Sequence, residues 1–286
     1  MKIVYQGSPG AYSHLAAQKI YPKSVFIPCN TFEDCFKNCY ENEEYKTIIP
    51  VENSIAGRVA DIQYLINKYK LQIYSEHFQE IKHNLMILKD SDIKNIKSVR
   101  SHSQAISQCQ KLINTHKFEP IIAADTAGSA KYISEKKLKN EAAIASDLAA
   151  KIYDLQIIKK NIEDDHSNVT RFLIMGKKKL HPELGNKNYI TSCIFKVKNK
   201  PAALYKCLGG FATNNVNLSK LESFSDQNSF EQYLFICDMY GHIEDPKIQK
   251  SLEELGFHTV NLDILGVYEA SAVSYTHLRA HETSEN

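Results

Sequence analysis

Short apolar runs alternate with amphipathic segments along residues 1–175 of the chain. The runs are short enough for buried strands, and between them apolar residues recur at the spacing of helices. This alternation predicts an α/β fold in which helices flank largely parallel sheets. We expect strands over residues 2–6, 24–28, 47–51, 71–77, 83–88, 98–101, 121–124, 142–145 and 170–175. We expect helices over residues 13–20, 31–40, 57–67, 103–115, 126–135 and 146–152.

A second region follows a break in this pattern. Residues 177–189 are polar, contain Pro182 and Gly185, and have the composition of a linker. Beyond them the periodicity predicts the order βαββαβ, a ferredoxin-like module in which Pro201 begins the first helix. Its strands are expected over residues 190–197, 216–223, 231–239 and 260–268, and its helices over residues 201–211 and 245–255.

Small polar residues recur where an expected strand is followed by an expected helix. In open α/β sheets ligands bind at the carboxyl ends of strands, and helix N-termini at that edge favour anions. The pattern indicates a pocket rich in hydrogen-bond donors, suited to a small carboxylate ligand. Ordinary helix capping by the same side chains is the alternative. The junctions are Gly7–Ser13, Glu52–Ser54, Ser101–Gln104, Asp125–Ser129 and Ser146.

The composition is that of a soluble globular protein. Of the 286 residues, 43% are apolar and 24% are charged, and the formal net charge of +2 creates no basic field for nucleic acid. The seven cysteines lack zinc-ligand spacing, so we expect reduced thiols, no metal site and a cytoplasmic protein. The N-terminal segment reaches a glycine turn too soon for a signal peptide, and no apolar run has membrane length. We therefore expect no membrane partner.

Five motifs give these junctions a family context. GSPGAYSH, VENSIAGRV, SHSQAISQC, AAIASDLAAKIYDL and NVTRFLIM resemble those of the prephenate dehydratase family, in its order and at about its spacing. The resemblance implies a catalytic domain over residues 1–178 with two lobes, like a periplasmic binding protein, the second lobe covering roughly residues 78–158. Residues 179–189 would form the linker. Residues 190–269 resemble an ACT domain, a small-molecule-sensing module, and residues 270–286 are expected to be a disordered or non-native tail.

The resemblance implies a reaction in L-phenylalanine biosynthesis. Prephenate loses its ring hydroxyl and a carboxylate together, which gives phenylpyruvate, water and carbon dioxide without a metal or an organic cofactor. A general acid beside the leaving hydroxyl would contribute about 10²–10⁴-fold to the rate. By resemblance that acid is Thr170, acting as an oriented donor in a dry site. Without the family, Thr170 is an ordinary β-branched strand residue.

The family's motifs imply further site residues. The implied catalytic set is Thr170, Asn53, Glu52, Ser101 and Gln108. The implied substrate contacts are Ser8, Tyr12, Ser54, Gly57, Thr126, Arg171 and Phe172. Arg171 and Thr170 point to opposite faces of an extended strand, so a structural ion pair for Arg171 stays open. The alternative for Phe172 is packing, and the alternative for Gln108 is an ordinary amide at the surface or at the edge of the core. His14 and His102 are candidate acids by residue type, with a structural role as the alternative.

The ACT-like region implies L-phenylalanine as an effector, bound across the interface of a homodimer or homotetramer. Where the family has a glycine and an Arg-Pro pair, this chain has Ala202 and Phe224-Ser225. The methyl group of Ala202 hinders close backbone approach, and the missing arginine removes a planar cation. We expect weakened or altered phenylalanine sensing, with a dimerisation module as the alternative. The implied effector contacts are Ala202, Ala203, Leu204, Asn217, Leu218, Glu222 and Ser223.

Two other functions stay open. An arogenate dehydratase acts on a substrate that carries an amine in place of the keto group, and the residues do not separate the two substrates. A non-catalytic protein that binds small anions would share the two-lobed body. The motif NVTRF and the absence of a signal peptide favour the enzyme.

Overall fold

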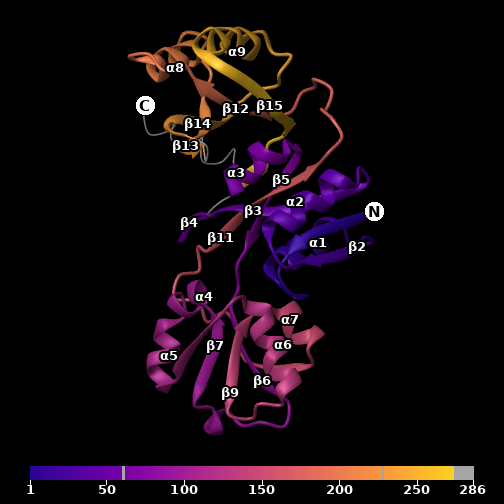
Figure 1. Ribbon diagram of the computed structural model, residues 1–286. Coiled ribbons are helices and arrows are strands. Elements are labelled where there is room, and N and C mark those ends of the chain that lie inside the picture. The colour runs from indigo at the N-terminus through magenta and orange to yellow at the C-terminus, as the bar shows by residue number, and fades with distance from the viewer. Residues whose placement is uncertain (60–61, 227–228, 274–286) are drawn as a thin grey trace. The chain divides into compact units, whose positions relative to one another are not determined.

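The computed structural model describes residues 1–59, 62–226 and 229–273 (Figure 1). The chain divides into two compact units. The first unit comprises Met1–Asn38, Glu44–Val59 and Phe78–Phe172, and the second contains the remaining residues. Residues 274–286 of the expected tail lie outside the described residues.

The first sheet has the strand order β2-β1-β3-β11-β5, with β4 paired antiparallel to β3. β1 runs parallel to both β2 and β3. Apolar residues on alternate positions, among them Ile3, Tyr5, Ile48 and Phe172, form a core with Ala16 and other residues of the first helix. Its elements are β1 (Lys2–Gln6), α1 (Tyr12–Ile20), β2 (Val25–Cys29), α2 (Phe32–Glu41), β3 (Tyr45–Asn53), β4 (Gly57–Arg58), β5 (Gln72–Glu80) and β11 (Val169–Gly176).

The second sheet has the order β10-β6-β9-β7-β8 and separates two layers of helices (Figure 1). Leu85 and Ile87 pack toward Ile106 of α4, whereas Met86 and Leu88 pack in a second cluster with residues of α6 and α7. Both faces are therefore covered, which is why β6 and β9 are buried along their whole length. The elements are β6 (Asn84–Leu88), η1 (Ile93–Asn95), β7 (Ser98–His102), α4 (Ser103–Ser107), α5 (Gln110–His116), β8 (Glu119–Ala123), α6 (Thr126–Lys136), β9 (Glu141–Ala145), α7 (Asp147–Ile152) and β10 (Leu155–Lys159).

The second unit contains the predicted βαββαβ module, together with α3 (Ile62–Tyr69). Its sheet has the order β13-β14-β12-β15, with antiparallel neighbours throughout. Phe195, Phe211 and Leu255 lie in one core between this sheet and its two helices. The elements are β12 (Tyr189–Val197), α8 (Ala203–Thr213), β13 (Leu218–Asp226), β14 (Ser229–Tyr240), α9 (Pro246–His258) and β15 (Thr259–Glu269).

Several element predictions were wrong in detail. The helix predicted over residues 57–67 begins as a hairpin, because Gly57 has a φ of 76° and pairs with Asn53, and α3 begins at Ile62. The helix predicted over residues 103–115 breaks at Gln108 and Cys109 into α4 and α5.

The edge of the second sheet and the start of α8 also differ from expectation. β10 was not predicted, and β6 runs antiparallel to both β9 and β10, so this sheet is mixed rather than mostly parallel. Pro201 lies before α8, whose N-cap is Ala202. All seven cysteines lie within the described residues, are buried and form no disulfide bond, as expected. Within the described residues, none of the helices has the length and apolarity needed to cross a membrane.

Candidate functional site

The side chain of Asn53 joins β3 to the start of β11. Its Oδ1 accepts the backbone N–H groups of Ile55 and Ala56 at 3.0 and 2.8 Å. Its Nδ2 lies 2.7 Å from Asn168 Oδ1 and 2.9 Å from Thr170 Oγ1. Because the two backbone groups require an oxygen acceptor, the nitrogen of the amide must face Thr170.

This arrangement determines how the hydroxyl of Thr170 can act. Thr170 is 8% exposed and lies on β11. Its oxygen accepts the proton of Asn53, so its own O–H can be directed toward a third group. In a site with little water, a hydroxyl oriented in this way can stabilise charge that develops on a departing oxygen.

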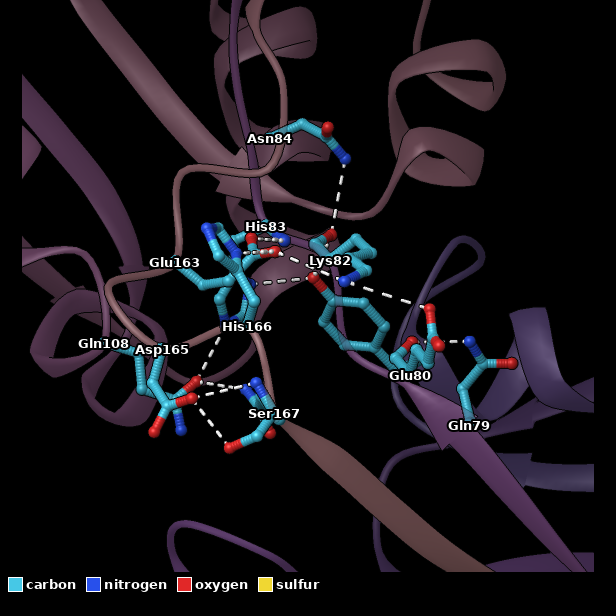
Figure 2. Close-up of polar contacts among 12 residues, drawn as sticks. Gln79, Glu80, Lys82, His83, Asn84, Gln108, Glu163, Asp165, His166 and Ser167 are labelled. Carbon is cyan, nitrogen blue, oxygen red and sulfur yellow. Dashed lines mark hydrogen bonds and ion pairs between the residues drawn. The ribbon is translucent and has the colours of Figure 1, made fainter. Parts of the chain in front are cut away.

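A hydrogen-bonded run continues from Asn168 to Tyr12. Asn168 is 2% exposed, and its Nδ2 donates to Gln108 Oε1 at 2.7 Å. The same oxygen lies 3.0 Å from His83 Nε2, and His83 Nδ1 lies 2.8 Å from the hydroxyl of Tyr12. Tyr12 lies in α1, His83 directly precedes β6, Gln108 follows α4 and Asn168 precedes β11. Figure 2 shows the part around His83 and Gln108.

A buried carboxylate supports His83 from the other side (Figure 2). Glu163 is 3% exposed and accepts the backbone N–H of His83 at 2.9 Å. Lys82 Nζ and His166 Nδ1 lie 3.8 and 3.3 Å from its other oxygen. Burial lowers the pKa of the His83 ring, and the bond to Gln108 and the charge of Glu163 oppose this shift only in part. His83 is therefore neutral near pH 7.

Three further bonds hold the loops of the two sheets together within the first unit. Ser8 donates to Asp125 at 3.1 Å, and Ser146 donates to the carbonyl oxygen of Gly10 at 2.6 Å. The hydroxyl of Tyr12, already 2.8 Å from His83 Nδ1, also lies 3.0 Å from the carbonyl oxygen of Lys82. The sequence-predicted residues Ser8, Tyr12, Asn53, Gln108 and Thr170 thus all lie in one unit.

The capping alternative explains several of the predicted junctions. The side chains of Asp125, His102 and Ser146 accept backbone N–H groups in the first turns of α6, α4 and α7. Thr126 follows as the first residue of α6. At these junctions the polar residue stabilises its own helix, whereas Asn53 precedes a hairpin rather than a helix.

Three predicted site residues have structural partners in place of a ligand. Ser101 is fully buried and donates to the carbonyl oxygen of Ile144 at 2.6 Å, which ties β7 to β9. Ser54 donates to the carbonyl oxygen of Ser167 at 2.9 Å. Phe172 is 1% exposed in the core of the first sheet, so the structure favours the packing interpretation for it.

The other predicted residues lie on strands and at the start of α8. Glu52 is exposed on β3 opposite Arg58, Gly57 is exposed in the hairpin, and Arg171 follows Thr170 on β11. Ala202, with a φ of 59°, precedes Ala203 and Leu204 of α8. Asn217 adjoins β13, which carries Leu218, Ser223 and Glu222. The carboxylate of Glu222 accepts from Gln63 of α3 at 3.1 and 3.0 Å and pairs with Lys220 at 3.0 Å.

Sequence reasoning missed His83, Asn168 and Glu163. Asn168 stands inside the motif NVTRFLIM, where an amide at the start of an apolar strand was a usable signal. His83 and Glu163 sit at the ends of apolar runs, and no local pattern distinguishes them from surface residues. In the part of the chain that the structure describes, no three His, Cys, Asp or Glu side chains gather closely enough to hold a metal ion.

Comparisons with known proteins agree with the motifs. The family model for prephenate dehydratase matches residues 3–180. A bifunctional N-acyl-homoserine lactone acylase/prephenate dehydratase from Komagataeibacter europaeus is 37% identical over 94% of this chain and 96% of its own. Arogenate dehydratase 2 from Petunia hybrida is 33% identical over 95% of this chain and 72% of its own.

Solved structures share the whole fold. One described as GqqA, a novel type of quorum quenching acylases, has a TM-score of 0.90 and 37% identity over 96% of this chain and 99% of that one. The prephenate dehydratase of Arthrobacter aurescens, solved in complex with L-Phe, has a TM-score of 0.87 and 24% identity over 99% of both chains. The family model, the relatives and the two-lobed α/β fold agree, and the chain belongs to the prephenate dehydratase family.

Proposed function

We propose that this chain converts prephenate to phenylpyruvate, water and carbon dioxide, with Thr170 as the donor to the leaving hydroxyl. The observation that carries the proposal is the 2.9 Å contact from Asn53 Nδ2 to Thr170 Oγ1, because it leaves the proton of Thr170 to face a substrate. The ring carbon–oxygen bond and the bond to the carboxylate break together. The departing hydroxyl takes a proton through Thr170 and leaves as water, and solvent restores that proton.

The substrate of this chain could be prephenate or arogenate, and the similar proteins include dehydratases named for each. The Petunia relative is named as an arogenate dehydratase, and the Komagataeibacter relative is named in part as a prephenate dehydratase. We favour prephenate because the Komagataeibacter relative has the higher sequence identity to this chain, 37% against 33%, and because the match covers 96% of that relative. Both substrates lose the same hydroxyl and carboxylate, so Thr170 would serve either one in the same way.

A turnover assay with the two substrates in parallel tests the proposal. Phenylpyruvate from prephenate is read by its ultraviolet absorbance in alkali, and phenylalanine from arogenate is read by chromatography. We expect prephenate to have the higher kcat/KM, and we expect Thr170→Ala to lose about 10²–10⁴-fold in kcat without unfolding. A protein that binds prephenate without turnover would be a binding protein instead.

For the second unit we propose an ACT domain over residues 190–269, joined by a linker over residues 179–189 to a catalytic domain over residues 1–178. The Arthrobacter structure carries L-Phe, which supports phenylalanine as the ligand here. Ala202 holds a left-handed conformation at the start of α8, where a glycine would let a ligand approach the backbone more closely.

Calorimetric titration with L-phenylalanine tests this second proposal. We expect weak binding by the natural chain and tighter binding by Ala202→Gly. Micromolar binding with strong inhibition of the natural chain would show that Ala202 is harmless. A homodimer or homotetramer and a cytoplasmic location remain predictions, the first open to sedimentation analysis.

A further inference from the structure

The hydrogen bonds between Asn53 and Gln108 have a single direction. Asn53 Oδ1 is occupied by two backbone N–H groups, so Nδ2 must be the atom that faces Asn168 Oδ1. With its oxygen used in this way, Asn168 presents Nδ2 to Gln108 Oε1. Each amide therefore determines which atom the next residue must present.

The same rule determines the tautomer of His83. Gln108 Oε1 can only accept, so His83 Nε2, 3.0 Å away, must carry a proton. In the neutral ring Nδ1 is then an acceptor, so the single proton of the Tyr12 hydroxyl is shared between Nδ1, 2.8 Å away, and the carbonyl oxygen of Lys82, 3.0 Å away. The backbone N–H of His83 donates to Glu163 at 2.9 Å, which restrains the main chain from which the ring extends.

We propose that His83 is a positioning residue for the dehydration: its Nε2–H holds Gln108 and, through Asn168 and Asn53, orients the hydroxyl of Thr170. The inference rests on the proposed function, because Thr170 is the group that His83 serves. Four hydrogen bonds separate the two residues, from His83 to Gln108, Asn168, Asn53 and Thr170 in turn. His83 acts through these neighbours and needs no contact with substrate.

The physical effect lies in orientation rather than binding. Without the donor of His83, the oxygen of Gln108 keeps only Asn168 as a partner, and the amide can turn. Rotation there removes the acceptor of Asn168 and loosens Asn53, so the proton of Thr170 is no longer aimed. A misdirected Thr170 proton reduces the stabilisation of the transition state more than the binding of the substrate. It therefore lowers kcat more than it raises KM.

Two conservative substitutions separate this role from simple packing. In His83→Gln the terminal amide nitrogen stands where Nε2 was, so the donor to Gln108 is kept. In His83→Asn the amide nitrogen stands where Nδ1 was, and Gln108 loses its donor. We expect His83→Gln to retain kcat within about tenfold and His83→Asn to lose about 100-fold, with KM within about threefold in both.

A matched control and a double-mutant cycle complete the kinetic test. His116→Gln makes the same change on an exposed histidine in the last turn of α5 and is expected to leave kcat unchanged. In an Asn53→Asp background, where the run is already broken, His83→Asn should add less than a threefold loss. Equal kcat values for the two His83 variants, a loss confined to KM, or fully multiplicative losses would overturn the inference.

A spectroscopic measurement tests the geometry apart from turnover. In the ¹⁵N NMR spectrum of histidine-labelled protein at pH 7, His83, assigned by its absence in His83→Gln, should show a protonated Nε2 and an unprotonated Nδ1. The opposite tautomer would contradict the inference even in an active enzyme. If His83 shows the expected tautomer but the protein turns over neither prephenate nor arogenate, the proposed function is wrong and the hydrogen-bond geometry stands.

Discussion

The amide of Asn53 points its nitrogen, not its oxygen, at Thr170 Oγ1, over a distance of 2.9 Å. The opposite orientation would place an acceptor beside Thr170 and direct the threonine proton at Asn53. The substitution Asn53→Asp produces this opposite chemistry with almost the same shape. It keeps an oxygen for Ile55 and Ala56 but places a second oxygen where the donor stood.

We expect Asn53→Asp to lower kcat by at least about 100-fold, because Thr170 would then donate to the new carboxylate instead of the substrate. Steady-state kinetics with prephenate measures the loss, and near-UV circular dichroism checks that the fold is kept. An Asp variant with kcat near that of the natural chain would show that the orientation of Thr170 does not depend on Asn53.

Gly10 and Gly57 provide a matched pair for backbone strain, since both have positive φ, 93° and 76°. A Cβ on Gly10 would lie 2.6 Å from Ala149 Cα in α7, whereas one on Gly57 would meet nothing within 4 Å. We expect Gly57→Ala to cost about 1 kcal/mol of folding free energy from strain alone. Gly10→Ala should cost about 3 kcal/mol, because overpacking adds to strain.

Urea denaturation of the two alanine variants measures both values. The comparison is informative because the substitution is the same and only the space around it differs. Equal destabilisation would mean that the loop after β1 moves away from α7 without cost, against the bond that Gly10 makes with Ser146.

Replacing Ala202 or its neighbour Ala203 by glycine is expected to change the stability of the protein in opposite directions. Ala202 has a φ of 59°, so glycine would relieve strain there, partly offset by greater freedom of the unfolded chain. We expect Ala202→Gly to stabilise the protein by about 0.5 kcal/mol. Ala203 is buried in the first turn of α8, so Ala203→Gly should destabilise by about 1 kcal/mol. Thermal unfolding of both variants checks the signs, and a destabilised Ala202→Gly would contradict the strain argument.

His14 predicts a loss of stability in mild acid. Its Nδ1 accepts the backbone N–H of Gly10 at 3.0 Å, and its ring stacks on Tyr5 with centroids 4.9 Å apart. Burial lowers the pKa of His14 below its usual value. The unfolded chain therefore binds a proton at a higher pH than the folded chain, so stability is full above about pH 6.5 and falls as pH drops through this window.

Urea denaturation at pH 7.5 and 5.5 tests the dependence. His14→Gln keeps an acceptor but does not titrate in this range, so its stability should fall less between the two pH values than that of the natural chain. His83 shifts in the same direction and contributes equally to both proteins, which isolates His14 in the difference. Identical falls in the two proteins would exclude a role for His14.

Most of the fold could be predicted because its strands are short, apolar and bounded by turn residues. The exceptions have tertiary causes. β10 reads as an ordinary amphipathic stretch, and only its antiparallel pairing with β6 makes it a strand. The hairpin at Gly57 replaces the start of a helix because the pairing of β4 with β3 overrides a helical pattern.

The site was predictable only in part. Asn53 and Thr170 are separated by 117 positions and meet at 2.9 Å, and the family motifs alone linked them beforehand. Ser101 carries a hydroxyl at the junction of a strand and a helix, as expected of a site residue, yet this hydroxyl donates to the carbonyl oxygen of Ile144 on β9. A hydroxyl at a strand end does not reveal whether its partner is a ligand or a neighbouring carbonyl, whereas the direction of a hydrogen-bonded run becomes visible only in three dimensions.

The two N–H groups that fix Asn53 belong to the main chain of Ile55 and Ala56. Any amino acid except proline supplies such a group, so these two positions can accept nearly every residue type while the two bonds that orient Asn53 are kept. A proline at either position would remove one of the two bonds to Asn53, although no side chain that contacts Asn53 would have changed.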